Sequence, residues 1–351
     1  MTPAHSDETE RLEHLNRQAA AMLRRAGFNM EDELDPMAPG GNNRVYLARG
    51  SGGPWVVKHY FRDATDPRDR LTAEWSFARF ARDHDIAATP RPLAKDEQHG
   101  LAAYEHIPGR ALKPGEPGVA HMTAAADFIA ALAACRRTEA ARALPDASEA
   151  CFSLADHCAC VDRRIARLSA LTPTDDADAA AQRWIGNTLL PAWQVARREL
   201  ESTARCLPSW ADPLHQEQRV ISPSDFGFHN AIVEPGGRLR FIDFEYAGWD
   251  DPAKLVCDFF CQPAVPAPRG QASAFASSIA ALTPDPMSTL QRMELLMPVY
   301  RIKWCCILLN IFLPPGARRR QFAGSSQELH TMKELQLRKA MRSMATSALP
   351  A

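Results

Sequence analysis

The distribution of apolar residues predicts a small α+β region near the N-terminus. Apolar residues recur at helical spacing from about Glu10 to Gly27, which predicts a leading amphipathic helix. Two short runs rich in valine and aromatic residues, 44–47 and 54–60, flank a glycine-rich turn and predict a β-hairpin. A second helix is expected over 71–85, and 101–107 is a further extended run. This part of the chain therefore predicts a β-rich lobe with one inserted helix.

The rest of the chain is richer in alanine and is predicted to be mainly helical. The expected helices include Val119–Ala143, Ser153–Leu171, Ala179–Leu207 and Leu290–Leu313. Pro191 should kink or split the third of these, because proline removes a helical hydrogen bond. One extended island, from Asn230 to Phe244, interrupts the helical pattern. The pattern thus predicts a large helical region built around a short strand pair.

The length and charge of the chain limit the classes of protein to which it can belong. A chain of 351 residues exceeds the usual single compact core, which favours two lobes or domains. Its 41 Lys and Arg against 42 Asp and Glu give a net charge of −1, unlike the basic excess of nucleic-acid binders. The apolar run that comes closest to the length of a membrane helix, Cys305–Leu313, is still too short for one. The polar N-terminus does not resemble an export signal. With nine cysteines that form no evident disulfide framework, these features predict a cytoplasmic protein that binds neither nucleic acid nor membranes.

The segment from Ser222 to Glu245 holds the most informative polar residues. Asn230 and Asp243 flank Glu234–Gly237, a Glu-Pro-Gly-Gly turn expected to close a β-hairpin. The hairpin would return Asp243 to the side of Asn230, and Asp225 lies in the loop that leads to the same end. Two carboxylates and an amide would converge there, and such oxygen ligands suit Mg²⁺ bound together with substrate phosphates. Phosphoryl transfer needs this metal, a residue that orients the acceptor hydroxyl, and a cation on the nucleotide phosphates.

Asp225 followed by Asn230, and then Asp243-Phe-Glu, is similar to the catalytic loop and metal motif of the aminoglycoside phosphotransferase and choline kinase superfamily. The segment after Asp243, which includes Asp258, looks particularly like that of its members. The resemblance extends over roughly 35–258. It implies an α+β, two-lobed, protein-kinase-like fold and an enzyme that phosphorylates a hydroxyl of a small molecule.

The resemblance also implies a role for each residue of the candidate site. Asp225 would be the catalytic base, and Asn230 and Asp243 would hold Mg²⁺. Lys58 would contact the α- and β-phosphates of ATP or GTP, with Glu74 as its ion-pair partner. The remaining implied nucleotide contacts are the phosphate-covering loop Gly40, Gly41, Asn42 and Asn43 and the hinge residues Glu105 and Ile107.

The expected organisation follows from the same resemblance. It comprises a leading helix (1–27), a nucleotide-binding small lobe (28–104), a hinge (105–112) and a helical large lobe with the catalytic loop and acceptor site (113–351). The leading helix would pack on the small lobe or on a partner, in a monomer or a homodimer. The acceptor would be an amino alcohol, a sugar, an aminoglycoside or a related metabolite.

The sequence departs from the family at two places. Pro223-Ser224 stands where the family usually has His-Gly, which concerns the geometry of the catalytic loop. The glycine loop is also reduced to two glycines and two asparagines. The alternative function is therefore a nucleotide-binding pseudokinase with a regulatory or scaffolding role. A protein kinase is disfavoured because no Ala-Pro-Glu segment follows Asp243.

Other polar and aromatic clusters have simpler structural interpretations. His157, Cys158 and Cys160 lack the second cluster that a zinc site would need. The segment 175–178 fits a helix N-cap, with an acidic clamp for a cationic substrate as the alternative. The segment 318–320 fits a solvated loop, with contact to an anionic acceptor as the alternative.

Three aromatic residues, Trp249, Tyr300 and Trp304, are a further candidate. They could form a wall for an amine through cation–π contacts. Buried packing is the favoured interpretation of these residues. The identity of the acceptor is therefore left open by the sequence.

Overall fold

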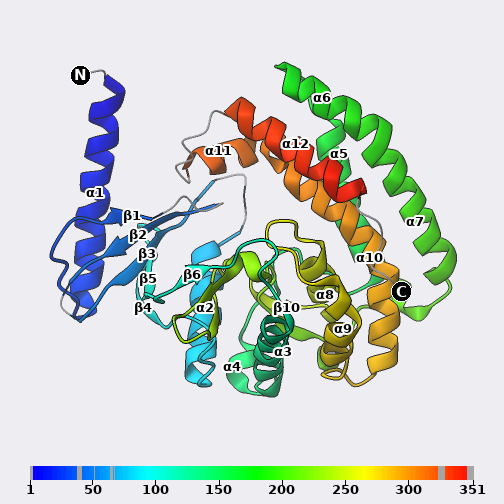
Figure 1. The fold of residues 1–351 in the computed structure, drawn as a ribbon, viewed down its shortest axis with the longest axis horizontal. Coiled ribbons are helices and arrows are strands. Elements are labelled where there is room, and N and C mark those ends of the chain that lie inside the picture. Colours follow the sequence, from blue (N-terminus) through cyan, green and yellow to red (C-terminus); the bar gives the residue numbers. More distant parts are fainter. Residues whose placement is uncertain are drawn as a thin grey trace.

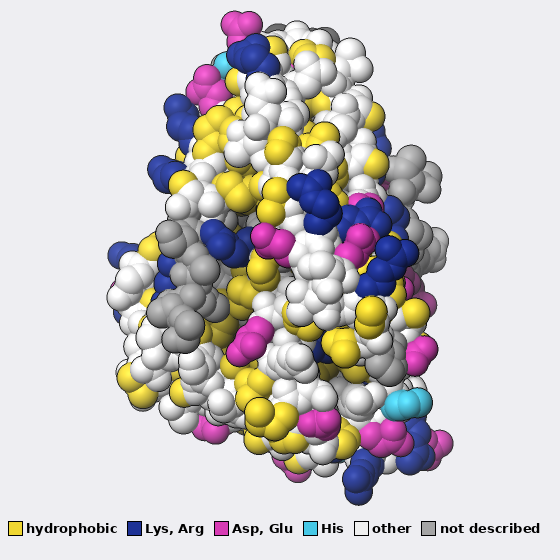
Figure 2. Space-filling model, turned by 90° about the vertical axis from the view of Figure 1, so that its right-hand side faces the viewer, with side chains coloured by type: hydrophobic (Ala, Val, Ile, Leu, Met, Phe, Trp, Pro, Cys, Tyr) yellow, Lys and Arg dark blue, Asp and Glu magenta, His cyan; other side chains and the backbone are white. Residues whose placement is uncertain are grey.

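The computed structural model describes residues 3–37, 42–50, 52–63, 66, 68–322 and 329–345. A β-sheet with two helices lies at one end of the molecule and a larger helical region at the other (Figure 1). This arrangement agrees with the predicted two lobes. On the face seen in Figure 2, acidic and basic side chains are interspersed among apolar ones, as the near-zero net charge leads one to expect.

The small lobe is built on a five-stranded antiparallel sheet of order β1-β2-β3-β5-β4. Its strands are β1 (Asp35–Pro36), β2 (Arg44–Ala48), β3 (Trp55–His59), β4 (Pro92–Asp96) and β5 (Leu101–Glu105). The predicted extended runs correspond to β2, β3 and β5, whereas neither the two-residue β1 nor β4 was predicted. Pro92 obscured β4, but proline is tolerated at the first residue of an edge strand, which is its position here.

The two faces of the sheet are covered by different helices. In β5, Leu101 and Ala103 belong to the cluster formed with α1 (Pro3–Arg25), whereas Ala102 and Tyr104 belong to the cluster formed with α2 (Arg70–Asp83). This division follows from the alternation of side chains along a strand. The leading helix therefore packs on the small lobe, and it begins earlier than the sequence pattern predicted.

Helix α2 also joins the cores of the two lobes. Asp69 caps its first turn, because the Asp69 side chain accepts a hydrogen bond from the Thr72 N–H at 3.0 Å. Phe77 and Phe80 belong to the large-lobe core, and the Phe77 ring lies 4.6 Å from the ring of Phe244. The helix that carries Glu74 is thus held from both sides.

The large lobe is mainly helical. Its helices are α3 (Val119–Ala134), α4 (Glu139–Arg142), α5 (Leu154–Ser169), α6 (Asp176–Trp184), α7 (Leu190–Ala204), α8 (Pro252–Cys261), α9 (Ala272–Ala280), α10 (Pro286–Leu308), α11 (Pro314–Phe322) and α12 (Leu329–Ala345). Its short strands are β6 (Arg110–Ala111), β7 (Val220–Ser222), β8 (Ala231–Val233), β9 (Leu239–Phe241) and β10 (Gly248–Asp250). Strand β6 pairs with β8, and β7 pairs with β10. The sequence pattern did not predict β6, β7 or β10, which are only two or three residues long.

Two predicted helices differ from the expected form. The helix expected over 119–143 ends at Ala134, and Thr138 caps the separate α4 through a hydrogen bond from the Ala141 N–H. The expected helix 179–207 runs on without a break but changes to π-helical geometry over Ile185–Leu189, just before Pro191, so that α6 and α7 are the α-helical parts on either side. Pro191 then falls in the first turn of α7, where its missing N–H costs little.

The stretch Pro286–Phe312 is long and apolar enough to cross a membrane by length and composition, but 61% of its most apolar window is buried in the fold. It contains the buried charged residues Arg292 and Lys303. Both are paired, Arg292 with Asp251 and Lys303 with Asp258. Burial and ion pairing are the features of a core helix, which is how α10 packs against α5, α8 and α12.

Candidate active site

Strand β3 and helix α2 bring Lys58 and Glu74 together. Lys58 lies on the sheet face that α2 covers, and its Nζ donates to Glu74 Oε1 at 2.7 Å. The other carboxylate oxygen of Glu74 accepts from the Tyr60 hydroxyl at 2.7 Å, and Tyr60 in turn contacts the Tyr104 hydroxyl. Glu74 is 1% exposed, so its orientation is fixed by these contacts. Burial alone would lower the pKa of Lys58, but its two carboxylate partners, Asp243 and Glu74, hold that pKa above the usual value.

The hairpin β8–β9 brings Asp243 to the same place. Its pairing is centred on the Pro-Gly-Gly turn, and the Ile242 N–H donates to the Asn230 carbonyl at 2.9 Å. Asp243 then has a φ of 69°, a left-handed conformation that aspartate tolerates better than most residues. Its Oδ1 accepts from Lys58 Nζ at 2.8 Å. Lys58 therefore links Glu74 of the small lobe to Asp243 of the large lobe.

Asp225 and Asn230 lie at the base of the same hairpin. The Asn230 side-chain N–H donates to the Asp225 carbonyl at 3.0 Å, which fixes the loop between them. His229 Nε2 lies 3.3 Å from Asp225 Oδ1. Burial would raise the pKa of Asp225, but His229 and the hydrogen bonds together lower it below its usual range. Correspondingly, burial opposes protonation of His229, whereas Asp225 raises the pKa of His229 above its usual value.

The departure from His-Gly before Asp225 leaves a compact loop. Ser224 has a φ of 66°, and Lys254 Nζ lies 3.3 Å from its hydroxyl. The Ser224 N–H donates to the Ser222 hydroxyl at 3.0 Å. These local contacts hold the loop that precedes Asp225.

The structure gives Asn42 and Asn43 contacts that the sequence did not predict. Both side chains donate to the Glu245 carboxylate, and Asn42 also donates to the Tyr246 hydroxyl at 3.1 Å. Burial and the neighbouring Asp243 raise the pKa of Glu245 to about 7. These bonds attach the loop of the small lobe to the large lobe. The other two residues predicted for this loop, Gly40 and Gly41, lie outside the described residues.

The predicted hinge residues follow β5. The Glu105 N–H donates to the Arg91 carbonyl at 2.9 Å, so any base contact by the Glu105 backbone falls to its carbonyl. The Glu105 carboxylate accepts from Arg240 at 3.2 Å, and Ile107 is buried. The backbone of this segment lies between the two lobes.

A cavity of about 350 Å³ brings four of the predicted site residues together, whereas Asn43, Lys58, Glu74, Glu105 and Ile107 are not part of its lining. Its lining includes Asn42, Asp225, Asn230 and Asp243, the basic residues Arg68, Arg164, Lys254, Lys303, Arg319, Arg320 and Lys339, and the acidic residues Glu149 and Asp258. The basic residues and Glu149 were not predicted as site residues, except that 318–320 was left open as an anion contact. They come from segments far apart in the chain, so no local motif marks them.

The other candidate clusters are structural. Trp249 and Tyr300 are buried, and their polar atoms bond to the Ala141 carbonyl and to His157. Of the three proposed aromatic residues, only Trp304 lines the cavity. Among the described residues, no group of three or more His, Cys, Asp or Glu side chains is placed to hold a metal ion. Asp175 accepts from the Asp178 N–H at 2.7 Å, which is the predicted N-cap of α6.

Comparisons with known proteins identify the family. Residues 33–283 match the model of the phosphotransferase enzyme family. The chain belongs to that family. No curated protein sequence gives a significant match.

Solved structures of this family and its relatives share the fold. A spectinomycin phosphotransferase in complex with ADP and spectinomycin is similar at a TM-score of 0.58 and 12% identity, covering 93% of this chain and 98% of the other. A choline kinase from Cryptosporidium parvum Iowa II gives 0.53 and 11%, covering 89% and 88%. A macrolide 2′-phosphotransferase from Brachybacterium faecium gives 0.52 and 18%, covering 89% and 99%. The predicted α+β, protein-kinase-like fold is confirmed, and the chain is a phosphotransferase of the small-molecule kinase class.

Proposed function

We propose that this phosphotransferase moves the γ-phosphoryl group of ATP, or of GTP, onto a hydroxyl of a small molecule, with Mg²⁺ as cofactor. The observation that supports this most is the placement of Asp243, Asn230 and Asp225 around one cavity, with Lys58 bonded to Asp243. Lys58 would supply a cation for the phosphates, Asn230 and Asp243 two oxygen ligands for the metal, and Asp225 a carboxylate base. Phosphoryl transfer needs these parts and little other protein chemistry.

Asn230 and Asp243 fit a Mg²⁺ site by the chemistry of their donor atoms. The amide N–H of Asn230 is bonded to the Asp225 carbonyl, which leaves the amide oxygen to act as a ligand. One carboxylate oxygen of Asp243 accepts from Lys58, and the side chain is 29% exposed. Carboxylate and amide oxygens suit Mg²⁺, which takes its remaining ligands from water and substrate phosphates. When bound, the ion neutralises charge on the phosphates of the nucleotide.

Lys58 and Glu74 have separate roles in this proposal. Lys58 contacts the α- and β-phosphates, and Glu74 positions the lysine from the buried side of α2. Asn42 and Asn43, which are bonded to Glu245, hold the loop that would cover the phosphates with Gly40 and Gly41. The backbone of the hinge residues Glu105 and Ile107 would contact the base.

Asp225 acts as the catalytic base. Its carboxylate accepts the hydrogen bond of the acceptor hydroxyl and orients the oxygen towards the γ-phosphorus. As the new O–P bond forms and the bond between the β- and γ-phosphates breaks, the hydroxyl proton passes to Asp225 and the nucleoside diphosphate leaves. The lowered pKa of Asp225 keeps the carboxylate ionised, so that it can accept the hydrogen bond of the acceptor hydroxyl.

The alternative, a pseudokinase, differs in one observable property. It would bind nucleotide without transferring a phosphoryl group. Purified protein should therefore be incubated with Mg²⁺ and ATP, or Mg²⁺ and GTP, and a panel of hydroxyl metabolites, and release of the nucleoside diphosphate measured. Acceptor-dependent release supports the enzyme, whereas nucleotide binding without transfer to any acceptor supports the pseudokinase.

A further inference from the structure

The acidic groups at the acceptor end of the main cavity are already engaged by cations. The Glu149 carboxylate pairs with Arg164. Asp258 accepts from Lys303 Nζ at 3.1 and 3.0 Å and from the Trp304 indole N–H at 2.8 Å. A cationic acceptor needs a carboxylate of its own, because burying a charge without a partner is costly. Within the described lining, the carboxylates outside these pairs are those of the proposed catalytic and metal-binding residues.

Three cations of the same cavity have no such partner. Arg319 and Arg320 on α11 and Lys339 on α12 line it, and no ion pair joins any of them to a carboxylate of the described residues. The Arg319 Nε atom is buried without a hydrogen-bond partner in the described part of the chain. Burial lowers the pKa of Arg320, and the neighbouring Arg319 lowers it further. An anion in the cavity would give Arg319 Nε a partner and offset the repulsion between the two guanidinium groups.

Helix α11 is held in position over the cavity by the small lobe. Arg318 Nε lies 2.9 Å from Asp63 Oδ2, and Arg44 Nε donates to the Phe322 carbonyl at 2.5 Å. The Phe322 ring contacts Phe61 at a centroid distance of 5.4 Å. These contacts are made by the residues on either side of Arg319 and Arg320 and hold α11 against the small lobe.

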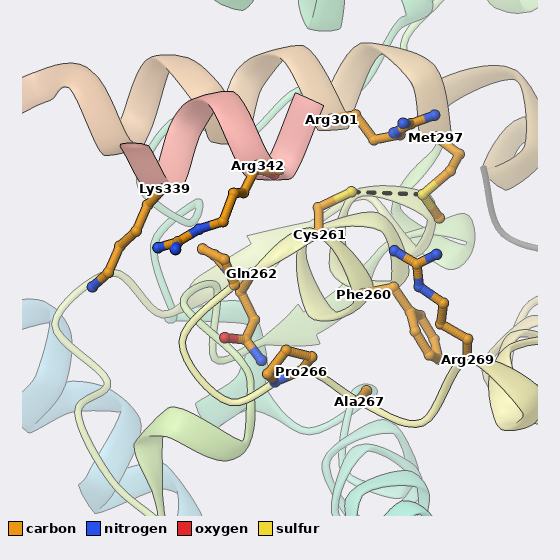
Figure 3. Close-up of a pocket in the computed structure, with 12 residues that line it drawn as sticks. Phe260, Cys261, Gln262, Pro266, Ala267, Arg269, Met297, Arg301, Lys339 and Arg342 are labelled. Atoms are coloured by element: carbon orange, nitrogen blue, oxygen red, sulfur yellow. Dashed lines mark hydrogen bonds between the residues drawn. The ribbon is translucent and has the colours of Figure 1, made fainter. Parts of the chain in front are cut away.

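The basic lining continues beyond the main cavity. A second cavity of about 330 Å³ shares Lys339 and Pro263 with the first and adds Arg269, Arg301 and Arg342 (Figure 3). Its described lining contains no Asp or Glu. Basic residues outnumber carboxylates in the lining of the first cavity, and the second adds further basic residues, so the two adjoining cavities favour ligands of negative charge.

We propose that the hydroxyl acceptor carries an anionic group, a carboxylate or a phosphate, which is held by Lys339 together with Arg319 and Arg320. This inference rests on the proposed function, because it assigns the substrate class of the same cavity. It disfavours amines such as choline and aminoglycosides as acceptors. The hydroxyl would lie at Asp225 and the anionic group towards α12.

Thermal unfolding tests this inference without knowledge of the acceptor. The protein is saturated with Mg²⁺ and AMP-PNP, a nonhydrolysable ATP analogue that occupies the γ-phosphate position, and then titrated with inorganic phosphate. Potassium chloride at equal ionic strength is the control for general salt effects. We expect phosphate to raise Tm beyond the chloride control. Lys339→Gln and Arg319→Gln should each lose most of that rise, and the exposed controls Lys113→Gln and Arg198→Gln should keep it.

A series of compounds with similar hydroxyl groups but different charges identifies the class of acceptor in the same assay. Gluconate, glucose and glucosamine present similar hydroxyl groups with a negative, zero and positive charge. Gluconate should shift Tm most and glucosamine least, and Lys339→Gln should weaken gluconate binding at least tenfold while the affinity for AMP-PNP stays unchanged.

Equal shifts for phosphate and chloride, a shift that survives Lys339→Gln and Arg319→Gln, or a larger shift with glucosamine than with gluconate would overturn the inference. Loss of AMP-PNP affinity in Arg319→Gln, with anion binding unchanged, would assign that arginine to the nucleotide instead. A nucleotide shift without an anion shift overturns this inference alone. Absence of the nucleotide shift contradicts the proposed function.

Discussion

Two sets of buried charges, Lys58 with Asp243 and Asp251 with His157 and Arg292, differ in their access to the cavity. In the first set, Lys58 and Asp243 are 11% and 29% exposed, and Asp243 faces the cavity. In the second set, Asp251 and His157 are 0% exposed and Arg292 is 7% exposed. Within each set the charged groups pair with one another, but only the first set leaves atoms available to a ligand.

This difference separates residues that act on substrates from residues that hold the scaffold. Asp251 accepts from Arg292 at 2.5 Å, from His157 at 3.0 Å and from the Ala253 N–H at 2.7 Å, so it fixes α10 and α5 to the start of α8. A fully engaged buried carboxylate can contribute to stability but not to binding. We therefore expect substitutions in the first set to change turnover and substitutions in the second to change stability.

Asp225→Asn should have the largest effect on turnover. The substitution is nearly isosteric but removes the base, whose contribution is typically about 10²–10⁴-fold in rate. That range corresponds to roughly 3–5 kcal/mol of barrier. Turnover of a true acceptor should fall by at least about a hundredfold, while Tm and nucleotide affinity stay close to the parental values. The exposed control Asp127→Asn should change none of the three quantities. Turnover at close to the parental rate would show that the catalytic loop has been misassigned.

Asp251→Ala should have the largest effect on stability. It leaves Arg292 buried without its carboxylate and removes the N-cap of α8, and breaking a buried pair in this way typically costs about 3–5 kcal/mol. Asp285 is the matched control, because it also caps a helix that begins with proline but is exposed. Asp285→Ala should cost only about 1 kcal/mol in urea unfolding. Equal costs for the two variants would mean that the buried network adds nothing to the cap.

The stability contribution of Asp251 should also depend on pH. Burial would raise the pKa of Asp251, but Arg292 and His157 lower it to about 2. A carboxyl with a lowered folded-state pKa stabilises the protein above its unfolded value of about 3.9 and loses that contribution as pH falls towards 2. The destabilisation caused by Asp251→Asn, measured by urea unfolding, should therefore shrink by about 2–3 kcal/mol between pH 5 and pH 2. If the difference in unfolding free energy between the parental protein and Asp251→Asn stays the same over this range, the pKa of Asp251 is not lowered in the folded state.

Glu74→Gln should give the smallest of these effects. Lys58 and the Tyr60 hydroxyl donate to different oxygens of Glu74, so glutamine keeps an acceptor oxygen for only one of them and removes the charge that holds the lysine. We expect turnover to fall about tenfold, equivalent to about 1.4 kcal/mol, and Lys58→Ala to lose more than Glu74→Gln. If Lys58→Ala keeps the parental rate, the lysine does not contact the phosphates.

The sequence predicted the parts of the fold that follow from local patterns. The hairpin centred on Gly236, the strand of Lys58 and the helix of Glu74 all occur as expected, because alternation, turn residues and helical spacing are local signals. Strands β1, β4, β6, β7 and β10 were missed. Strand β4 begins with proline, and the others are two or three residues long, too short for alternation to identify them.

The acceptor end of the cavity could not be predicted in the same way. Its charged residues come from α5, α8, α10, α11 and α12, whose contacts depend on how helices pack. Asn42 and Asn43 show a related limit. The sequence placed them in a phosphate loop, and only the structure shows that their side chains bond to Glu245.

The binding of Mg²⁺ and ATP tests the central claim most directly. The shift of Tm should be measured with millimolar nucleotide in the parental protein and in Asp243→Ala, with and without EDTA. At a hundredfold excess over Kd, the expected stabilisation is about 2.7 kcal/mol, and it should shrink with EDTA and in the variant. No shift with either ATP or GTP would contradict the assignment of this cavity to a nucleotide and its metal.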